Sequence, residues 1–171
     1  MTTDESAPHT HKAAAASKDS VQISPAAPAD LAELLALLAA VKLPTEGVAE
    51  QLGGFLVARD AMGRLLGCVG LERYGDVGLL RSVAVSPQMQ RLGIGSRLTA
   101  AALEYAAANS VKEVVLLTTT ARDFFASRFG FVEAERTDYE SRLAQSPEWN
   151  LPRCSSAAFM RLDLNAHAPH S

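Results

Sequence analysis

The segment 83–98 joins residue types whose spacing suits the binding of a phosphate group. It places an apolar stretch, a polar turn and two glycines, Gly93 and Gly95, in front of a helical pattern. Glycines at such a junction let the backbone turn sharply and approach a ligand closely. The start of a helix adds unpaired N–H groups and a partial positive charge, and Arg91 and Arg97 flank the glycines. The segment therefore predicts an anion-binding loop.

The class of phosphate ligand is narrowed by what the loop lacks. No Lys-Ser or Lys-Thr pair follows the second glycine, so a P-loop is excluded. Leu98 occupies the place of the third glycine in a dinucleotide-binding fingerprint, so that motif is incomplete as well. What remains is Gln90-x-x-Gly93-x-Gly95 between a strand and a helix. Taken alone, two such glycines are packing or turn residues more often than ligand contacts.

Histidine and cysteine chemistry is limited by where those residues lie. The chain has four histidines, and all lie in polar terminal segments: His9, His11, His167 and His170. We therefore expect no Ser-His-Asp or Cys-His catalysis and no histidine-based metal site in the folded part. Cys68 and Cys154 lack metal-site spacing and are too few for a disulfide framework. The plainest interpretation of both is a buried, small apolar residue.

The elements that must position the loop follow from apolar periodicity. A leucine stripe after Asp30 predicts a helix with an N-cap, Pro44 ends it, and a weaker helix is expected from Thr45 to about Leu52. Strands are predicted at 21–23, 55–58, 65–71 and 77–85, the last three as an antiparallel meander. Helices are predicted at 93–109 and 121–129, a central strand at 114–117, and closing strands at 131–132 and 157–164. The segment 135–153 is expected to be a long, partly helical excursion, which is usually functional or mobile.

The composition is that of one folded domain with polar ends. Of the 171 residues, 48% are hydrophobic and 20% are charged, which suits a single core. Residues 1–20 and 165–171 lack an apolar period and are expected to be disordered tails around one domain, 21–164. The net charge of −3 gives no global positive field, so nucleic acid and membrane are not expected partners. Without a signal sequence or a membrane-spanning run, we expect a cytoplasmic protein.

The loop and its neighbours resemble the Gcn5-related N-acetyltransferase (GNAT) superfamily, whose loop has the form Gln/Arg-x-x-Gly-x-Gly/Ala. The resemblance includes the preceding Val-Ala-Val-Ser-Pro at 83–87 and the later Phe-Gly-Phe at 129–131, and it extends over 21–164. It implies an α/β fold with a mixed, mostly antiparallel central sheet, helices on both faces, and a splayed notch between the fourth and fifth strands. It also implies acetyl-CoA as cosubstrate, no metal, and transfer of the acetyl group to the amine of a small molecule by direct attack in a ternary complex.

The resemblance assigns the binding of CoA to two groups of residues. In the superfamily, the strand before the loop pairs through its main chain with the pantetheine arm, which is here the role of Val83 and Val85. Phe124 and Phe125 belong to the core, to the apolar lining of the arm, or to both. The pyrophosphate loop consists of Gln90, Arg91, Leu92, Gly93, Ile94, Gly95 and Ser96.

Acyl transfer requires a neutral amine and a proton for the leaving thiolate. Glu72 is the first candidate for the base, because it is expected at the end of a strand that opens onto the cleft. Asp76 is the second, as a base or a substrate contact; a solvated charge beside a glycine turn is the plainer interpretation of both. Arg81 is a candidate for binding an anionic group of the substrate, or it makes a cross-strand pair.

The sequence does not identify the general acid. Many superfamily members have a tyrosine four residues before the Gly of the Gly-Phe pair, but this position is Ala126 here, or Phe125 with a one-residue shift, and neither donates a proton. Tyr74, Tyr139, Ser82 or a water can substitute, and the sequence does not choose among them. A thiolate can also leave unassisted. The missing tyrosine keeps a second hypothesis open, a non-catalytic acyl-CoA-binding regulatory or sensor module.

A finer resemblance is to acetyltransferases encoded in bacterial arsenic-resistance operons. It lies in the stretches 67–72, 74–77, 79–82 and 117–120 and in the region around Cys154. It implies a link to arsenic or toxin resistance, for which two cysteines alone are thin support. Members of the superfamily often dimerise, so a homodimer stays open.

Overall fold

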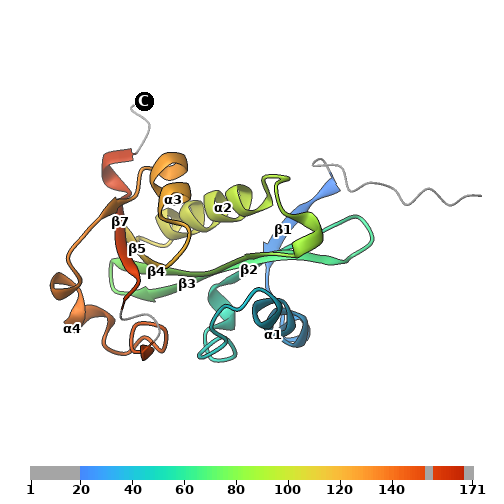
Figure 1. The fold of residues 1–171 in the computed structure, drawn as a ribbon, viewed down its shortest axis with the longest axis horizontal. Coiled ribbons are helices and arrows are strands. Elements are labelled where there is room, and N and C mark those ends of the chain that lie inside the picture. The colour runs from blue at the N-terminus through green and yellow to red at the C-terminus, as the bar shows by residue number, and fades with distance from the viewer. Residues whose placement is uncertain (1–19, 153–155, 168–171) are drawn as a thin grey trace, which may run out of the picture.

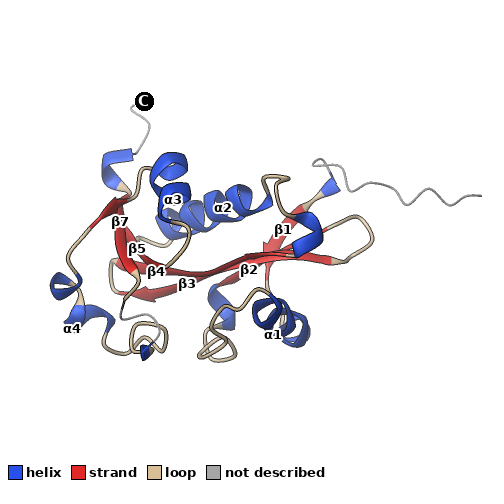
Figure 2. Ribbon diagram, viewed as in Figure 1, coloured by secondary structure: helices blue, strands red, loops and turns tan. Residues whose placement is uncertain are grey.

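A seven-stranded sheet lies at the centre of the part of the chain that is described, residues 20–152 and 156–167 of a computed structural model (Figure 1; Figure 2). The strand order is β1-β2-β3-β4-β5-β7-β6; β4 and β5 are parallel, and the other neighbours are antiparallel. The strands are β1 (Gln22–Pro25), β2 (Phe55–Arg59), β3 (Leu65–Tyr74), β4 (Val77–Val85), β5 (Glu113–Thr118), β6 (Val132–Glu133) and β7 (Ala158–Asp163). The expected mixed, mostly antiparallel α/β sheet is confirmed.

Helices cover both faces of this sheet, as predicted. The helices are α1 (Leu31–Ala40), α2 (Ile94–Ala108), α3 (Arg122–Phe129) and α4 (Glu140–Leu143). In Figure 1, α2 and α3 lie on one face, and α1 and α4 lie on the other. Ile94 and Leu98 of α2 belong to the largest apolar cluster, whereas Leu34 and Leu38 of α1 belong to a separate cluster on the opposite face. The amphipathic stripes read from the sequence are thus the buried faces of these helices.

Local backbone geometry explains where helices end. Gly130 adopts a left-handed conformation (φ 79°), and its N–H bonds to the carbonyl of Ala126, which confirms the expected end of α3. The helix expected from Thr45 to Leu52 is wrong: residues 46–51 form turns, and a 3-10 turn spans Leu52–Gly54. Gly47 has a φ of 78°, which is incompatible with a right-handed helix at that point.

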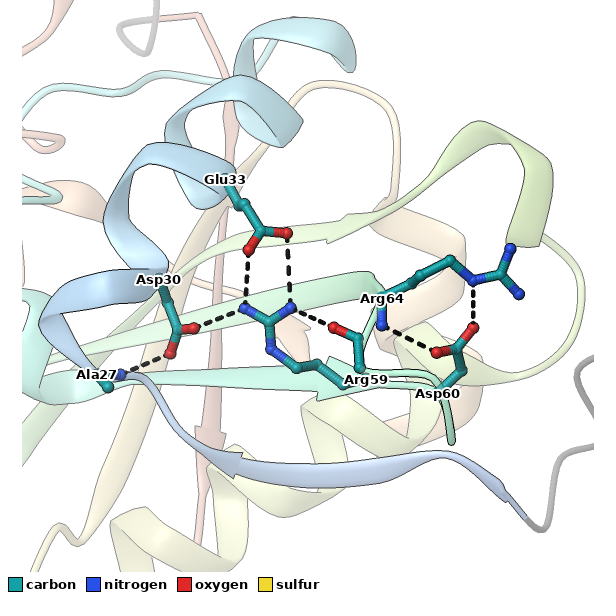
Figure 3. Close-up of polar contacts among 7 residues, drawn as sticks. Ala27, Asp30, Glu33, Arg59, Asp60 and Arg64 are labelled. Carbon is teal, nitrogen blue, oxygen red and sulfur yellow. Dashed lines mark hydrogen bonds and ion pairs between the residues drawn. The ribbon is translucent and has the colours of Figure 1, made fainter.

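Polar contacts at the edge of the sheet fix α1 against β2 (Figure 3). The sequence predicted that Asp30 caps α1, but its side chain makes no capping hydrogen bond to this helix. Its carboxylate instead accepts the N–H of Ala27 (2.7 Å) and pairs with Arg59 of β2 (2.6 Å). Glu33 also pairs with Arg59, at 3.2 Å. Asp60 accepts Nε–H of Arg64 across the β2–β3 turn, at 2.7 Å. The contacts of Asp30 and Glu33 hold α1 against β2, whereas the Asp60–Arg64 contact holds the β2–β3 turn.

The described part of the predicted excursion, residues 135–152, is partly helical, as predicted. It contains a 3-10 turn at Arg136–Asp138 and α4, and Tyr139, Leu143 and Trp149 pack on the sheet beside Phe159. The expected N-terminal tail and most of the C-terminal one lie outside the described residues, while Asn165–His167 forms a 3-10 turn. Within the described ranges, none of the helices has the length and apolar character needed to cross a membrane.

Candidate active site

The strands β4 and β5 separate where β4 changes direction. In the described strands they pair in parallel only as far as Leu80 opposite Leu116, although β4 continues to Val85. The register between β3 and β4 shifts next to Ser82, which has a φ of 58°. Leu80 and Val83 consequently pack against the same apolar cluster although they are three residues apart. A β-bulge bends and twists a strand, so the bulge at Ser82 opens the notch that the resemblance predicted.

A cavity of about 500 Å³ occupies this notch, a size typical of small-molecule sites. Two cavities of about 250 Å³ each adjoin it at different ends. The first, called the loop cavity, shares Val85, Gln90 and Phe124 with the main cavity. The second, called the far cavity, shares Thr118 and Glu148, among others, with the main cavity, and none of its lining residues belongs to the loop cavity. The notch can therefore be approached from two sides.

The loop cavity has the geometry of an anion site. Arg91 and Gly93 adopt left-handed conformations (φ 73° and 76°), which turn the chain into α2. The first intrahelical bond runs from the N–H of Arg97 to the carbonyl of Gly93, so the N–H groups of the three residues between them have no partner within the helix. A Cβ at Gly93 would meet nothing within 4 Å, so the space beside the backbone is open. Unpaired N–H groups and the helix dipole then face an open cavity.

Nine of the ten residues predicted to bind the cosubstrate line these cavities. The main cavity is lined by Val83, Val85, Gln90 and Phe125, and the loop cavity by Val85, Gln90, Arg91, Gly93, Ile94, Gly95 and Ser96. Leu92 is the exception, because it packs against the apolar cluster beneath α2. Arg97 donates to the carbonyl of Val21 (3.1 Å), whereas Arg128 of α3, which the sequence analysis missed, lines the loop cavity.

Glu72 lies behind the notch, which corrects the expectation that it opens onto the cleft. Its side chain is fully buried and pairs with Arg81 at 2.9 Å, between Nη1 and Oε2. Its Oε1 accepts the hydroxyl of Tyr74 at 2.5 Å and that of Ser146 at 2.8 Å. Glu72 does not line the three cavities, so it has no contact with an amine bound there. Tyr74 is tied to the same carboxylate, and burial, reinforced by Glu72, raises the pKa of its phenol.

Of the other predicted catalytic and substrate-binding residues, Ser82 and Arg81 line the notch, and Asp76 does not. Ser82 lines the main cavity, and its Oγ accepts Nε–H of Arg81 at 3.0 Å. Arg81 reaches the same wall, and its guanidinium bonds to Glu72, Ser82 and the carbonyl of Pro44, so the cross-strand pair is present. Asp76 lies in the β3–β4 turn, at the opposite end of β4, and lines a separate depression. The expected contact of Asp76 with substrate is thus not supported by its position.

A carboxylate that the sequence analysis did not single out reaches the notch. Glu148 is 6% exposed, lines both the main and the far cavity, and its Oε2 has no hydrogen-bond partner among the described residues. Burial raises the pKa of Glu148 to about 7 against the lowering effect of Arg81, and Glu72 adds to the rise. The only sequence signal was an acidic residue between a proline and a tryptophan in a long connection.

Thiol and metal chemistry find no support at the notch. Cys68 of β3 is buried, and its thiol donates to the carbonyl of Ser82 in the neighbouring strand β4 (3.3 Å). Burial raises the pKa of this thiol to about 12. Cys154 lies outside the described residues. Within residues 20–152 and 156–167, no group of three or more potential metal ligands comes together.

Comparison with known proteins points to the same region of the chain. Residues 51–133, which span β2 to β6, match the family described as acetyltransferase (GNAT) domain. An amino-acid acetyltransferase of Mycobacterium tuberculosis H37Rv is 38% identical over 79 residues, covering 46% of this chain and 44% of that protein. An amino-acid acetyltransferase of Neisseria meningitidis serogroup B is 35% identical over 89 residues, covering 46% of this chain and 20% of that protein. The chain thus spans less than half the length of these relatives.

Solved structures extend the likeness to most of the chain. N-acetylglutamate synthase from Neisseria gonorrhoeae, complexed with coenzyme A and N-acetyl-glutamate, aligns with a TM-score of 0.72 and 25% identity over 84% of this chain and 35% of that one. An acetyltransferase of the GNAT family from Staphylococcus aureus Mu50 aligns with a TM-score of 0.69 over 84% of this chain and 99% of that one. Its identity of 19% shows a likeness of fold alone.

Proposed function

We propose that this chain, whose residues 51–133 match the family described as acetyltransferase (GNAT) domain, transfers the acetyl group of acetyl-CoA to the amine of a small, amino-acid-like molecule. The observation that carries this proposal is the notch between β4 and β5, which connects a glycine loop at a helix start to a mostly apolar cavity. A pyrophosphate requires the first feature, and the extended arm of CoA requires the second.

The residues at the notch fit CoA in chemistry and in space. The N–H groups at the start of α2 and the side chains of Arg91 and Arg128 supply positive charge at the loop cavity. Among the described strands, β4 has no partner on its β5 side beyond Leu80, so main-chain groups on that edge can bond the amides of the arm. Phe124 lines both cavities and supplies an apolar wall.

The chemistry is a direct transfer between two bound substrates. A neutral amine attacks the thioester carbonyl, a C–N bond forms, and the C–S bond breaks to release the thiolate of CoA. Backbone N–H groups of β4 near Val85 are suited to stabilise the oxyanion of the transition state. Ser82 is the one residue among the three predicted catalytic residues that lines the main cavity, and we assign to its hydroxyl a hydrogen bond to the leaving sulfur.

An amino-acid-like acceptor is supported by two observations. The relatives with at least 35% identity are named amino-acid acetyltransferases. The far cavity carries both a cationic side chain, Lys42, and an anionic one, Glu148, which suit the two charges of an amino acid. The far cavity also lies away from the glycine loop, so an acceptor and CoA do not compete for one entrance.

The proposal is tested by incubating the protein with acetyl-CoA and a panel of the twenty L-amino acids and simple primary amines. Mass spectrometry should detect a product heavier by one acetyl group, and thiol release should depend on the amine. Calorimetry should detect binding of CoA by the unmodified protein. Failure to bind CoA at millimolar concentration refutes the proposal at its first step.

A non-catalytic acyl-CoA-binding module is the second candidate, favoured by the lack of a tyrosine at the notch. Phe125 of α3 lines the main cavity, while the hydroxyl of Tyr74 bonds to Glu72 and Tyr139 is buried in the cluster beneath the sheet. This candidate requires normal CoA binding and a thioester consumption that no amine accelerates. The amine panel separates the two candidates directly.

On the sequence resemblance we further propose a role in arsenic or toxin resistance, a cytoplasmic location and a homodimer as the state to be tested. The buried, weakly acidic Cys68 disfavours arsenic binding at that thiol. Growth of a deletion strain in arsenicals, with and without the restored gene, tests the first proposal, and light scattering tests the third.

A further inference from the structure

We propose that Glu148 is the general base of this reaction: its carboxylate binds the ammonium group of the acceptor in the main cavity and removes the proton that blocks attack. The inference rests on the proposed function and names the residue that activates the acceptor.

Glu148 holds a distinctive position among the residues that line the cavities. The three adjoining cavities are lined by described residues of which Glu148 is the only carboxylate, and none of the others is a histidine or a tyrosine. Glu148 lines the main and the far cavity but not the loop cavity. An acceptor that enters through the far cavity therefore meets Glu148 at the junction with the main cavity, opposite the side where the glycine loop lies.

The carboxylate of Glu148 is buried and has an unused acceptor atom. A buried charged group without a hydrogen-bond partner is destabilising, and folded proteins keep few of them. Oε2 of Glu148 is such an atom in the described part of the chain. Arg81 lies close enough to affect its ionisation but is bonded to Glu72, Ser82 and Pro44 instead. A bound ammonium would supply the missing partner.

The segment around Glu148 is held in place by its neighbours. The hydroxyl of Ser146 donates to Glu72 (2.8 Å) and accepts the N–H of Trp149 (3.2 Å). The ring of Trp149 packs against Phe159 (5.4 Å between centroids), and the guanidinium of Arg136 lies 4.6 Å from its centre. Glu148 thus sits between two anchored neighbours. The buried Glu72–Arg81 pair acts here as a positioning element and not as the base.

The charges around Glu148 act on its ionisation in opposite directions. Arg81 of β4 and Glu72 of β3 both influence its carboxylate, while Lys42 of the loop after α1 lines the same far cavity. Burial dominates these influences and raises the pKa of Glu148 to about 7. A base whose pKa lies near the working pH is ionised in about half of the molecules and still accepts a proton well.

A primary amine loses two protons during the transfer, one to Glu148 and one to the leaving sulfur. The ammonium group gives one proton to Glu148, and the resulting neutral nitrogen forms the C–N bond with the acetyl carbonyl. As the C–S bond breaks, a second proton from the same nitrogen goes to the thiolate sulfur. Glu148 then returns its proton to solvent through the far cavity, so one proton is released for each acetyl group transferred.

The test compares Glu148→Gln with the unmodified protein, using the L-amino acid or amine that is acetylated fastest in the panel. Glutamine keeps the size of the side chain but cannot accept the proton, so kcat/KM should fall by about 10²–10⁴-fold, the usual range for a general base. The affinity for CoA should stay within about threefold, because Glu148 does not line the loop cavity. Glu148→Asp retains a carboxylate, so its kcat/KM should lie between those of the unmodified protein and Glu148→Gln.

The pH profile gives a readout that a purely structural role would not move. In the unmodified protein, kcat/KM should rise through pH 7 and then level off, whereas in Glu148→Gln it should keep rising toward the pKa of the amine itself. The matched control is Glu140→Gln, which removes the same charge from an exposed position in the same segment and should leave both profiles unchanged. Product from the unmodified protein, with an unaltered rate and profile in Glu148→Gln, overturns this inference alone. Absence of product with every amine overturns the proposed function, and this inference with it.

Discussion

Replacing Gly93 by aspartate tests the glycine loop without disturbing the fold. Gly93 has a φ of 76°, and a Cβ built there would meet nothing within 4 Å. The substitution therefore introduces backbone strain and a negative charge, but no steric clash. Gly63 in the β2–β3 turn offers a matched control, since it has a φ of 79° and equally open space but lines none of the three cavities.

The magnitude follows from charge repulsion. A non-glycine residue in the left-handed region costs about 1 kcal/mol, and both variants carry this cost. Only Gly93→Asp places a carboxylate beside the bound diphosphate. Two unit charges at about 6 Å in an effective dielectric of about 40 repel by about 1.4 kcal/mol, so a diphosphate with two charges is weakened by about 3 kcal/mol. This corresponds to an increase in Kd of roughly 100-fold.

Isothermal titration calorimetry with CoA, at fixed ionic strength, measures the difference. Both variants should unfold a few degrees below the unmodified protein, because about 1 kcal/mol shifts the Tm of a chain of this length by roughly 3 °C. Gly63→Asp should bind CoA normally. If the two variants bind CoA with Kd values within threefold of each other, the glycine loop does not hold the diphosphate and the reasoning is refuted.

Three further predictions concern stability. Gly54→Ala should lower the free energy of unfolding by about 1–3 kcal/mol in urea denaturation, because its Cβ would overlap the carbonyl oxygen of Leu71, whereas Gly53→Ala, which has open space, should change it little. Glu72→Gln removes half of a fully buried ion pair and should destabilise the fold by about 3–5 kcal/mol, measured in the same way. Glu148→Gln should raise the free energy of unfolding at pH 8 but not at pH 4. The pKa of Glu148 in the folded protein, about 7, exceeds the ordinary 4.5. The protonated carboxyl group of Glu148 therefore stabilises the fold fully below pH 4.5, and this contribution is lost as the pH rises through 7, a difference of roughly 3 kcal/mol.

The control for Glu72→Gln is a second ion pair of the same type at the surface. Glu133 pairs with Arg122, and both side chains are more than half exposed. Glu133→Gln should therefore change the free energy of unfolding by less than about 1 kcal/mol. Equal effects of Glu72→Gln and Glu133→Gln would contradict the structural role given to the buried pair. For Glu148→Gln, a loss of stability at pH 8 would contradict the raised pKa.

The buried carboxylate at the notch links stability to function. Proteins rarely keep an unpaired buried charge unless a site uses it. Glu148 weakens the fold at neutral pH and is the only acid that reaches the adjoining cavities in the described part of the chain. If Glu148→Gln both stabilises the protein and slows acetyl transfer, Glu148 lowers stability because the site needs it for function, and not because the segment is poorly packed.

The sequence by itself determined the sheet and the glycine loop, because the signals for both are contiguous. The strand end at Val85, the turn, Gly93 and the start of α2 lie within a dozen residues, and each has its own local preference for backbone conformation. The meander of β2, β3 and β4 was predictable for the same reason, since neighbouring strands are joined by short glycine turns.

Only the tertiary structure decided which side chains face the notch. The bulge at Ser82 adds one residue to β4, and a shift of one residue exchanges the two faces of a strand. Glu72 of β3 meets Ser146, 74 positions away in the sequence, and Glu148 is carried to the cavity by a segment that docks from the far side of the chain. No local pattern encodes such contacts, because they arise from the packing of segments that are distant in sequence.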